Sequence, residues 1–173
     1  MNTFKQLLIN TKRSKWTILF ILIVLALILI FINEKIEFDA FVASLGGTLT
    51  AYFGILRQTI DDDKVFRELF ISFNSRYSDE TNDLLNKLRI DNNYSLSEKD
   101  QLMIIDYFNL CSEEYLWYMK GRIPVKVWKA WEAGIFVNLS IHKVKEIFFS
   151  ETKNDKQKTS YYGFAEYITP KIY

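Results

Sequence analysis

Two uninterrupted apolar runs open the chain, and a mixed pattern of apolar and polar positions follows them. Residues 16–32 and residues 40–56 carry no charged side chain. At a rise of about 1.5 Å per residue, a helix of either length comes close to crossing a hydrocarbon core of about 30 Å. The link between the runs, NEKIEFD, is too short to hold a domain. The pattern therefore predicts an antiparallel hairpin of two transmembrane helices.

A signal peptide is the alternative explanation for the first run, because Lys12, Arg13 and Lys15 precede it. Against it, the run exceeds the usual apolar stretch of about 7–15 residues, and no small-residue cleavage pattern follows. Basic residues before the first run and Arg57 after the second contrast with a largely acidic link. This asymmetry predicts a multi-pass protein with both termini in the cytoplasm.

The second run is built from much smaller residues than the first. Its small and hydroxylic residues recur at helical spacing, which places them on one side of the helix. Those expected to pack helices or to line a pore are Ala43, Ser44, Gly47, Thr48, Ala51 and Gly54. Repeated small residues let two helix backbones approach closely in lipid. Two interpretations stay open. In the first, this side of the helix packs on the first run within one chain. In the second, it associates between copies of the chain, and such an assembly could enclose a pore.

Acidic residues flank the second run and would lie at the two mouths of such a pore. They are Glu37, Asp39, Asp61, Asp62 and Asp63. Rings of acidic side chains favour cations. The same residues are also explained without a pore. Acidic residues in a short external link follow from the membrane topology alone, and the aspartates after the second run would form a solvated acidic collar on the helix that follows.

The remaining residues, 57–173, show apolar positions at helical spacing and no sustained alternation typical of a strand. An aromatic and leucine stripe predicts that the second run continues as a long helix, with a break near Ser78. A capping box of Ser95 with Glu98, or of Ser97 with Asp100, is expected to begin the next helix. The further elements expected are helices over 100–120, 124–134 and 135–150, a polar linker over 151–160 and a closing helix over 161–168.

The predicted fold is therefore all-α, a two-helix transmembrane hairpin followed by a small cytoplasmic helical bundle. Its expected parts are a basic cytoplasmic N-terminus over residues 1–15, the hairpin over 16–56 and the helical domain over 57–173.

Charge is distributed unevenly along the helical domain. Residues 57–119 carry 7 basic and 13 acidic side chains, whereas residues 120–173 carry 10 and 5. In one interpretation the two halves pair, within or between subunits. In the other, the basic half meets a regulatory protein, anionic lipid or a phosphate-bearing ligand. The residues expected on that surface are Lys120, Arg122, Lys126, Trp128, Lys129, Trp131, Lys143 and Lys145. The two tryptophans could stack on bases, although their helical spacing is equally typical of a core.

The sequence lacks the residue groupings that metal binding and nucleophilic catalysis need. His142 is the only histidine and Cys111 the only cysteine, so a zinc site is not expected. Glu113 and Glu114 are adjacent, and adjacent helical positions point about 100° apart, so the two carboxyls do not converge on one substrate. No phosphate-binding glycine motif is present. We expect no enzyme activity, no metal and no cofactor.

Three stretches carry a resemblance to a known group of proteins. They are FRELFISFNSRY (66–77), YFNLCSEEYLWYMKGRIPVKVWKAWEAGI (107–135) and YYGF (161–164). Together they resemble a family of uncharacterised small bacterial membrane proteins in which a membrane hairpin precedes a helical domain. The resemblance implies a bacterial inner membrane and assigns no active residues. The architecture is also similar to that of some antiphage effectors, in which a sensor domain controls a membrane-damaging segment.

These observations lead to two functional expectations. The first is an oligomeric membrane effector or ion-channel-like protein, whose helical domain assembles and gates the membrane helices, with antiphage defence as its setting. The alternative is a membrane-tethered adaptor, whose hairpin only anchors it and whose aromatic groove around Trp117, Trp128 and Trp131 binds a partner protein. The expected partners are membrane lipid and further copies of the chain, besides a ligand of the basic half.

Overall fold

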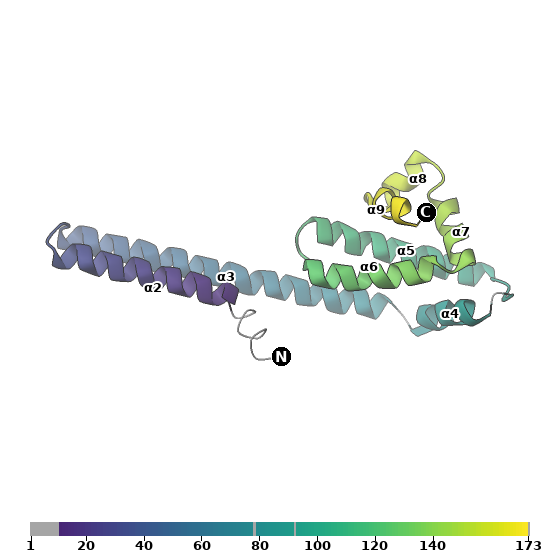
Figure 1. Ribbon diagram of the computed structural model, residues 1–173, viewed down its shortest axis with the longest axis horizontal. Coiled ribbons are helices and arrows are strands. Elements are labelled where there is room, and N and C mark those ends of the chain that lie inside the picture. The colour runs from purple at the N-terminus through teal and green to yellow at the C-terminus, as the bar shows by residue number, and fades with distance from the viewer. Residues whose placement is uncertain (1–10, 78, 92, 173) are drawn as a thin grey trace. The chain divides into compact units, whose positions relative to one another are not determined.

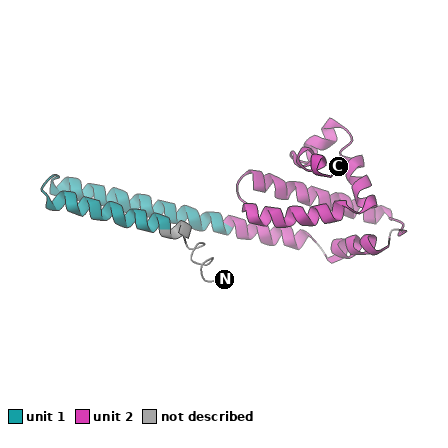
Figure 2. Ribbon diagram, viewed as in Figure 1, with its two compact units in different colours: residues 1–64 teal, residues 65–173 magenta. Residues whose placement is uncertain are grey.

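The computed structural model describes residues 11–77, 79–91 and 93–172, and every element in this part of the chain is helical (Figure 1). The elements are α2 (Thr11–Ile32), α3 (Phe38–Arg76), α4 (Asp79–Ile90), α5 (Glu98–Met119), α6 (Val125–Leu139), α7 (His142–Glu151), α8 (Asp155–Ser160), α9 (Phe164–Ile168) and the 3₁₀ turn η1 (Thr169–Lys171). The predicted all-α class is confirmed. Two compact units divide the chain, residues 1–64 and residues 65–173, and α3 contributes to both (Figure 2).

The first unit is a hairpin of α2 and the N-terminal part of α3. Near its turn, the rings of Phe31 and Phe41 stack with centroids 4.6 Å apart. Towards the other end, Phe20 stacks on Tyr52 at 4.3 Å, and the hydroxyls of Thr17 and Tyr52 are hydrogen-bonded at 3.0 Å. These pairs join early residues of α2 to late residues of the α3 segment, so the two helices are antiparallel. Of the expected basic N-terminus, residues 1–10 lie outside the described residues.

Both helices of this unit are long and apolar enough to cross a membrane. The apolar window of α2, Lys15–Ile32, has a mean hydropathy of 2.9, and that of α3 has a mean hydropathy of 1.3. No part of either window is buried inside the protein, unlike the core helix of a water-soluble domain. The predicted spans 16–32 and 40–56 fall within α2 and α3. A signal sequence near an N-terminus meets the same criteria of length and composition as α2.

The second unit is built around α5. This helix packs against α4, α6, α7 and α9, and together they enclose a hydrophobic core. Its largest fully buried side chains include Phe108, Trp128, Phe148 and Phe164, which come from four different helices. Residue Phe73, near the end of α3, is also buried in this core. The core explains why so many aromatic residues recur at helical spacing in this half of the chain.

The ends of α5 follow the sequence prediction. The Ser97 hydroxyl accepts a hydrogen bond from the Asp100 N–H at 3.2 Å, and the Asp100 carboxylate accepts one from the Ser97 N–H at 2.9 Å. This is the second of the two capping boxes that the sequence offers, and it satisfies two backbone donors that have no partner within the helix. After α5, Gly121 takes a φ of +70°, a backbone conformation that glycine adopts without a steric penalty. A break also separates α3 from α4, although Ser78 itself lies outside the described residues.

Two predicted boundaries are wrong. The helix expected to end at Gly134 continues to Leu139 as α6, because Ile135 and Leu139 are buried on either side of the next turn and hold the helix together. A glycine inside a helix costs only about 1 kcal/mol relative to alanine, which this packing outweighs. The expected linker over 151–160 contains the helix α8, whose first turn is capped by the Asn154 side chain, which accepts from the Gln157 N–H at 3.0 Å.

Candidate functional site

Larger side chains, and not the small residues of α3, form the contact between α2 and α3. We call this contact the α2–α3 seam. Between Phe41 and Ile55, the partly buried positions of α3 are Phe41, Leu45, Thr48, Tyr52 and Ile55. On α2 they are Thr17, Phe20, Val24, Leu27 and Phe31. Both sets alternate spacings of three and four residues, the pattern of helices that pack side by side along their length.

The small residues of α3 lie off the α2–α3 seam. We call Ala43, Gly47, Ala51 and Gly54 the small-residue face, and all four are exposed. A Cβ atom added at Gly47 or Gly54 would meet no atom within 4 Å, so neither glycine is needed for a close approach inside the chain. The interpretation in which this face packs on the first helix within one chain stays a prediction, and the open space at the two glycines does not support close packing there. The aromatic residues of the seam set the spacing of the two helices instead.

A groove of about 420 Å³ runs beside the seam. Its lining residues on α2 are Trp16, Leu19, Phe20 and Ile23, and those on α3 are Ser44, Gly47, Thr48, Ala51, Tyr52 and Ile55. The Thr48 hydroxyl donates a hydrogen bond to the Ser44 carbonyl oxygen at 2.8 Å, so the hydroxyl proton has its acceptor within the same helix. Thr48 is also partly buried in the seam. Its partial burial argues against a place facing a pore between copies, and the expectation that Thr48 lines a pore stays a prediction.

The expected acidic mouths consist of exposed side chains. Asp39 lies in the first turn of α3, where the positive end of the helix dipole favours it, and Glu37 precedes it. Further along α3, the Gln58 amide donates to the Asp62 carboxylate at 3.0 Å, and Arg57 lies 4.0 Å from Asp61. These contacts along the helix surface favour the solvated collar over a ring of free carboxylates for Asp61 and Asp62. Asp63 is exposed as well.

The residues of the expected basic surface have several different roles. Trp128 is only 1 % exposed, and its indole N–H donates to the Tyr167 hydroxyl at 3.2 Å, so it cannot stack on a ligand. Lys143 donates to the Tyr94 carbonyl oxygen at 2.5 Å and Lys145 to the Ile172 carbonyl oxygen at 3.3 Å. These two lysines tie chain segments together. The exposed members of the set are Lys120, Arg122, Lys126 and Lys129.

Trp131 is a core-edge residue. It is half-buried, and its ring stacks on Phe70 with centroids 5.9 Å apart and meets Phe73 edge-on at 6.0 Å. The interpretation of the two tryptophans as packing residues is thus the one that their surroundings support.

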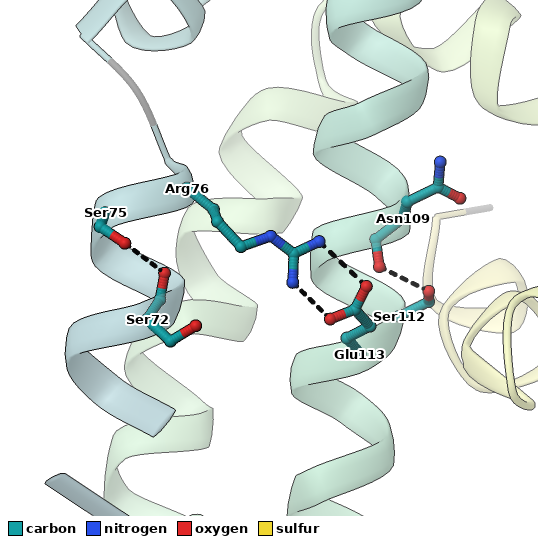
Figure 3. A network of polar contacts seen from close by, with 6 residues as sticks. All are labelled: Ser72, Ser75, Arg76, Asn109, Ser112 and Glu113. Carbon is teal, nitrogen blue, oxygen red and sulfur yellow. Dashed lines mark hydrogen bonds and ion pairs between the residues drawn. The ribbon is translucent and has the colours of Figure 1, made fainter. Parts of the chain in front are cut away.

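Glu113 and Glu114 point into different cavities, as their adjacent positions predict. Glu113 forms a bidentate ion pair with Arg76, in which Nη2 donates to Oε1 at 2.9 Å and Nη1 donates to Oε2 (Figure 3). The hydrogen bond to Glu113 raises the pKa of Arg76 above its ordinary value. This pair borders a polar cavity of about 520 Å³. Glu114 lines a separate cleft of about 270 Å³ between α3, α5 and α6.

The cleft beside Glu114 is the feature that the sequence analysis missed. Ala130, Gly134 and Asn138 recur every four residues along α6 and line one of its walls. A Cβ atom at Gly134 would meet nothing within 4 Å, so the absence of a side chain there leaves open space. The repeated spacing is a signal that could have revealed this wall, had the helix not been predicted to end at Gly134.

The chemistry of Cys111 and His142 is that of ordinary structural residues. Cys111 is 1 % exposed, and burial raises the pKa of its thiol well above the ordinary value, so the reactive thiolate is disfavoured. His142 is exposed beside Glu146, with Nδ1 at 3.4 Å from the carboxylate. Within the described residues, no group of three or more His, Cys, Asp or Glu side chains could hold a metal ion.

Comparisons of the chain with protein-family models, with curated proteins and with solved structures found no match. The resemblance to small bacterial membrane proteins therefore stays a prediction.

Proposed function

We propose that the protein is an integral membrane protein whose hairpin crosses a bacterial inner membrane and assembles with further copies through the small-residue face of α3. In this proposal both termini and the helical domain lie in the cytoplasm. The observation that carries it is the exposure of Gly47 together with its neighbours on that face, beside a seam that already holds α2 and α3 together.

Close van der Waals packing, and not the hydrophobic effect, drives helices together in lipid. Lipid tails cover leucine and isoleucine as well as another helix does, so association depends on close van der Waals packing. Large side chains on α2, such as Leu22 and Leu29, are exposed and suit lipid. The small-residue face offers lipid little side-chain surface but lets a second backbone come close. A second copy presents the same face, which allows a two-fold symmetric contact.

We further propose that assembly has a functional consequence, as an effector or channel-like protein that changes membrane permeability. Support comes from α3, which belongs to both units: its N-terminal part carries the small-residue face, and Phe73 near its end is buried in the helical domain. A change in packing of the domain around Phe73 therefore acts on the helix that carries the assembly face. Antiphage defence is the setting that the architectural similarity implies.

The test compares two glycines that differ only in the side of α3 on which they lie. Gly46 and Gly47 are adjacent, both are exposed, and an added Cβ meets nothing within 4 Å at either. Gly47→Leu and Gly46→Leu therefore leave the packing within one chain intact. We expect light scattering of the full chain in nanodiscs to give a defined oligomer for the wild type and Gly46→Leu, and a smaller species for Gly47→Leu. Ion flux into liposomes should fall with the same substitution.

A monomeric wild type, or identical masses for the two variants, would reject assembly through this face. The tethered adaptor is then the better explanation, since the helical domain has a core of its own. Replacement of residues 1–64 by an unrelated two-helix anchor distinguishes the two functions, because an adaptor keeps its activity and an effector loses it.

A further inference from the structure

The cleft beside Glu114 has apolar and aromatic walls that come from three helices of the second unit. Phe73 of α3 and Tyr77, which follows the end of α3, line the cleft together with Trp131 and Gly134 of α6, and α5 contributes Tyr107 and Glu114. Its volume of about 270 Å³ corresponds to roughly nine water molecules at about 30 Å³ each. A molecule of modest size therefore fits between the rings.

In the part of the chain that the structure describes, Glu114 is the one carboxylate that lines this cleft, and no Lys or Arg lines it with Glu114. Burial raises the pKa of Glu114, and the charge of Arg76 opposes this rise. The guanidinium group of Arg76, however, forms its hydrogen bonds with both carboxylate oxygens of Glu113. Among the described residues, no hydrogen-bond donor or ion-pair partner reaches the Glu114 carboxyl. Burying a carboxyl without a partner costs free energy. Carboxyls of this kind are therefore uncommon, and those that occur are found more often at functional sites.

The other polar side chains of the cleft already have partners. The Asn138 amide nitrogen donates to the Tyr107 hydroxyl at 2.9 Å, and the Asn138 carbonyl oxygen accepts from Arg89 at 3.0 Å. The Asn74 amide nitrogen donates to the Phe70 carbonyl oxygen at 2.7 Å. These bonds fix the walls, so the cleft is preformed and its unmatched polar group is Glu114.

We propose that this cleft binds a small organic ammonium ion, whose charge pairs with the Glu114 carboxylate and whose apolar groups contact the rings of Tyr77 and Trp131. Aromatic faces attract cations, and a carboxylate beside them supplies the full opposite charge. An inorganic cation would need several oxygen ligands, whereas this cleft offers one carboxylate among mostly apolar walls. The inference stands apart from the proposed assembly of the hairpin.

Protonation of Glu114 gives the site a distinctive pH dependence. Burial raises the pKa of Glu114 to about 8, the charge of Arg76 opposes this rise, and that of Glu113 adds to it. Cys111 on the same helix is protonated, and the residues of α6 that line the cleft are uncharged. A cation binds the ionised form, so the proton must leave first. Affinity should therefore increase about tenfold from pH 6 to pH 7 and less than about twofold from pH 8 to pH 9.

The probe is choline, a cation at every pH, compared with 3,3-dimethylbutan-1-ol, which has the same shape and no charge. Tryptophan fluorescence of the full chain reports binding, because Trp131 lines the cleft, and the detergent must lack a choline headgroup. The variants are Glu114→Gln, which keeps the shape of the neutral acid, and Glu98→Gln, an exposed residue on the same helix, as the matched control. Gly47→Leu is included to separate this site from the hairpin.

We expect choline to bind at least tenfold more tightly than the alcohol, with the stated pH profile. Glu114→Gln should lose both the affinity and the pH dependence, whereas Glu98→Gln and Gly47→Leu should keep them. Gly134→Ala places a methyl group in the cleft without disturbing the helix and should weaken choline binding several-fold with an unchanged pH profile. Equal binding of the alcohol, no binding of choline, or unchanged binding in Glu114→Gln or Gly134→Ala would overturn the inference.

Discussion

The hairpin and the helical domain are both rich in apolar residues, but they place them in opposite ways. No described residue between 15 and 64 is buried, whereas the domain encloses a continuous core that includes Phe108 and Phe148. The domain therefore buries apolar side chains in its own core. The apolar surface of the hairpin, in contrast, has to be covered by lipid or by other chains. Hydrophobic composition alone does not distinguish these two cases, but the periodicity of the domain and the unbroken runs of the hairpin do.

Small residues at a spacing of four occur in both regions, and in both they are exposed and line a groove. On α3, Gly47 and Ala51 lie beside the α2–α3 seam and remain exposed. On α6, Ala130 and Gly134 are exposed as well, and they line the cleft beside Glu114. The same pattern thus provides an assembly face in our proposal for the hairpin and a binding cleft in our inference for the domain. What differs is the lining of the two grooves, because apolar side chains of α2 line the groove beside Gly47, whereas Glu114 lines the cleft beside Gly134.

The largest expected effect tests the difference in burial. Phe108→Ala removes a ring that is 0 % exposed and should lower the free energy of unfolding of the helical domain by about 3–5 kcal/mol. Phe53→Ala removes a ring of the hairpin that is 62 % exposed, so it should leave that free energy nearly unchanged. Chemical denaturation of the full chain in detergent, followed by circular dichroism, measures both. Similar losses for the two variants would show that the domain does not unfold independently of the hairpin.

A smaller effect is expected from pH and sharpens the argument for Glu114. Its pKa of about 8 in the folded domain lies above the ordinary value of 4.5, so the unfolded chain releases this proton more readily. The contribution to stability is therefore fully present below about pH 4.5 and is lost as pH rises through about 8. Relative to Glu114→Gln, the wild type should lose stability between these values, on the order of a few kcal/mol. Parallel stability curves for the two proteins would contradict a raised pKa.

The smallest expected effect concerns the ion pair between α3 and α5. The side chains of Arg76 and Glu113 are 44 % and 35 % exposed, so solvent screens their attraction. A double-mutant cycle with Arg76→Ala and Glu113→Ala should give a coupling energy below about 1 kcal/mol. Urea unfolding of the four proteins provides the values. A coupling well above this limit would mean that the pair is a main attachment of α3 to the domain.

The sequence by itself determined the features that depend on neighbouring residues. The two apolar helices follow from uncharged runs, the start of α5 was limited to two neighbouring capping boxes, and the divergence of Glu113 and Glu114 follows from helical geometry. Each depends on side chains within a few positions of one another, which the order of residues specifies directly.

Tertiary structure decided the features in which distant residues compete. Gly134 lies inside a helix because buried residues on the following turn outweigh its weak local preference. The aromatic residues of the seam, and not the glycines, set the spacing of α2 and α3, since Phe20 and Tyr52 meet across it. Arg76 pairs with Glu113 and leaves Glu114 without a partner. Such choices depend on which surfaces the fold brings together, and the spacing of residues along one helix does not encode them.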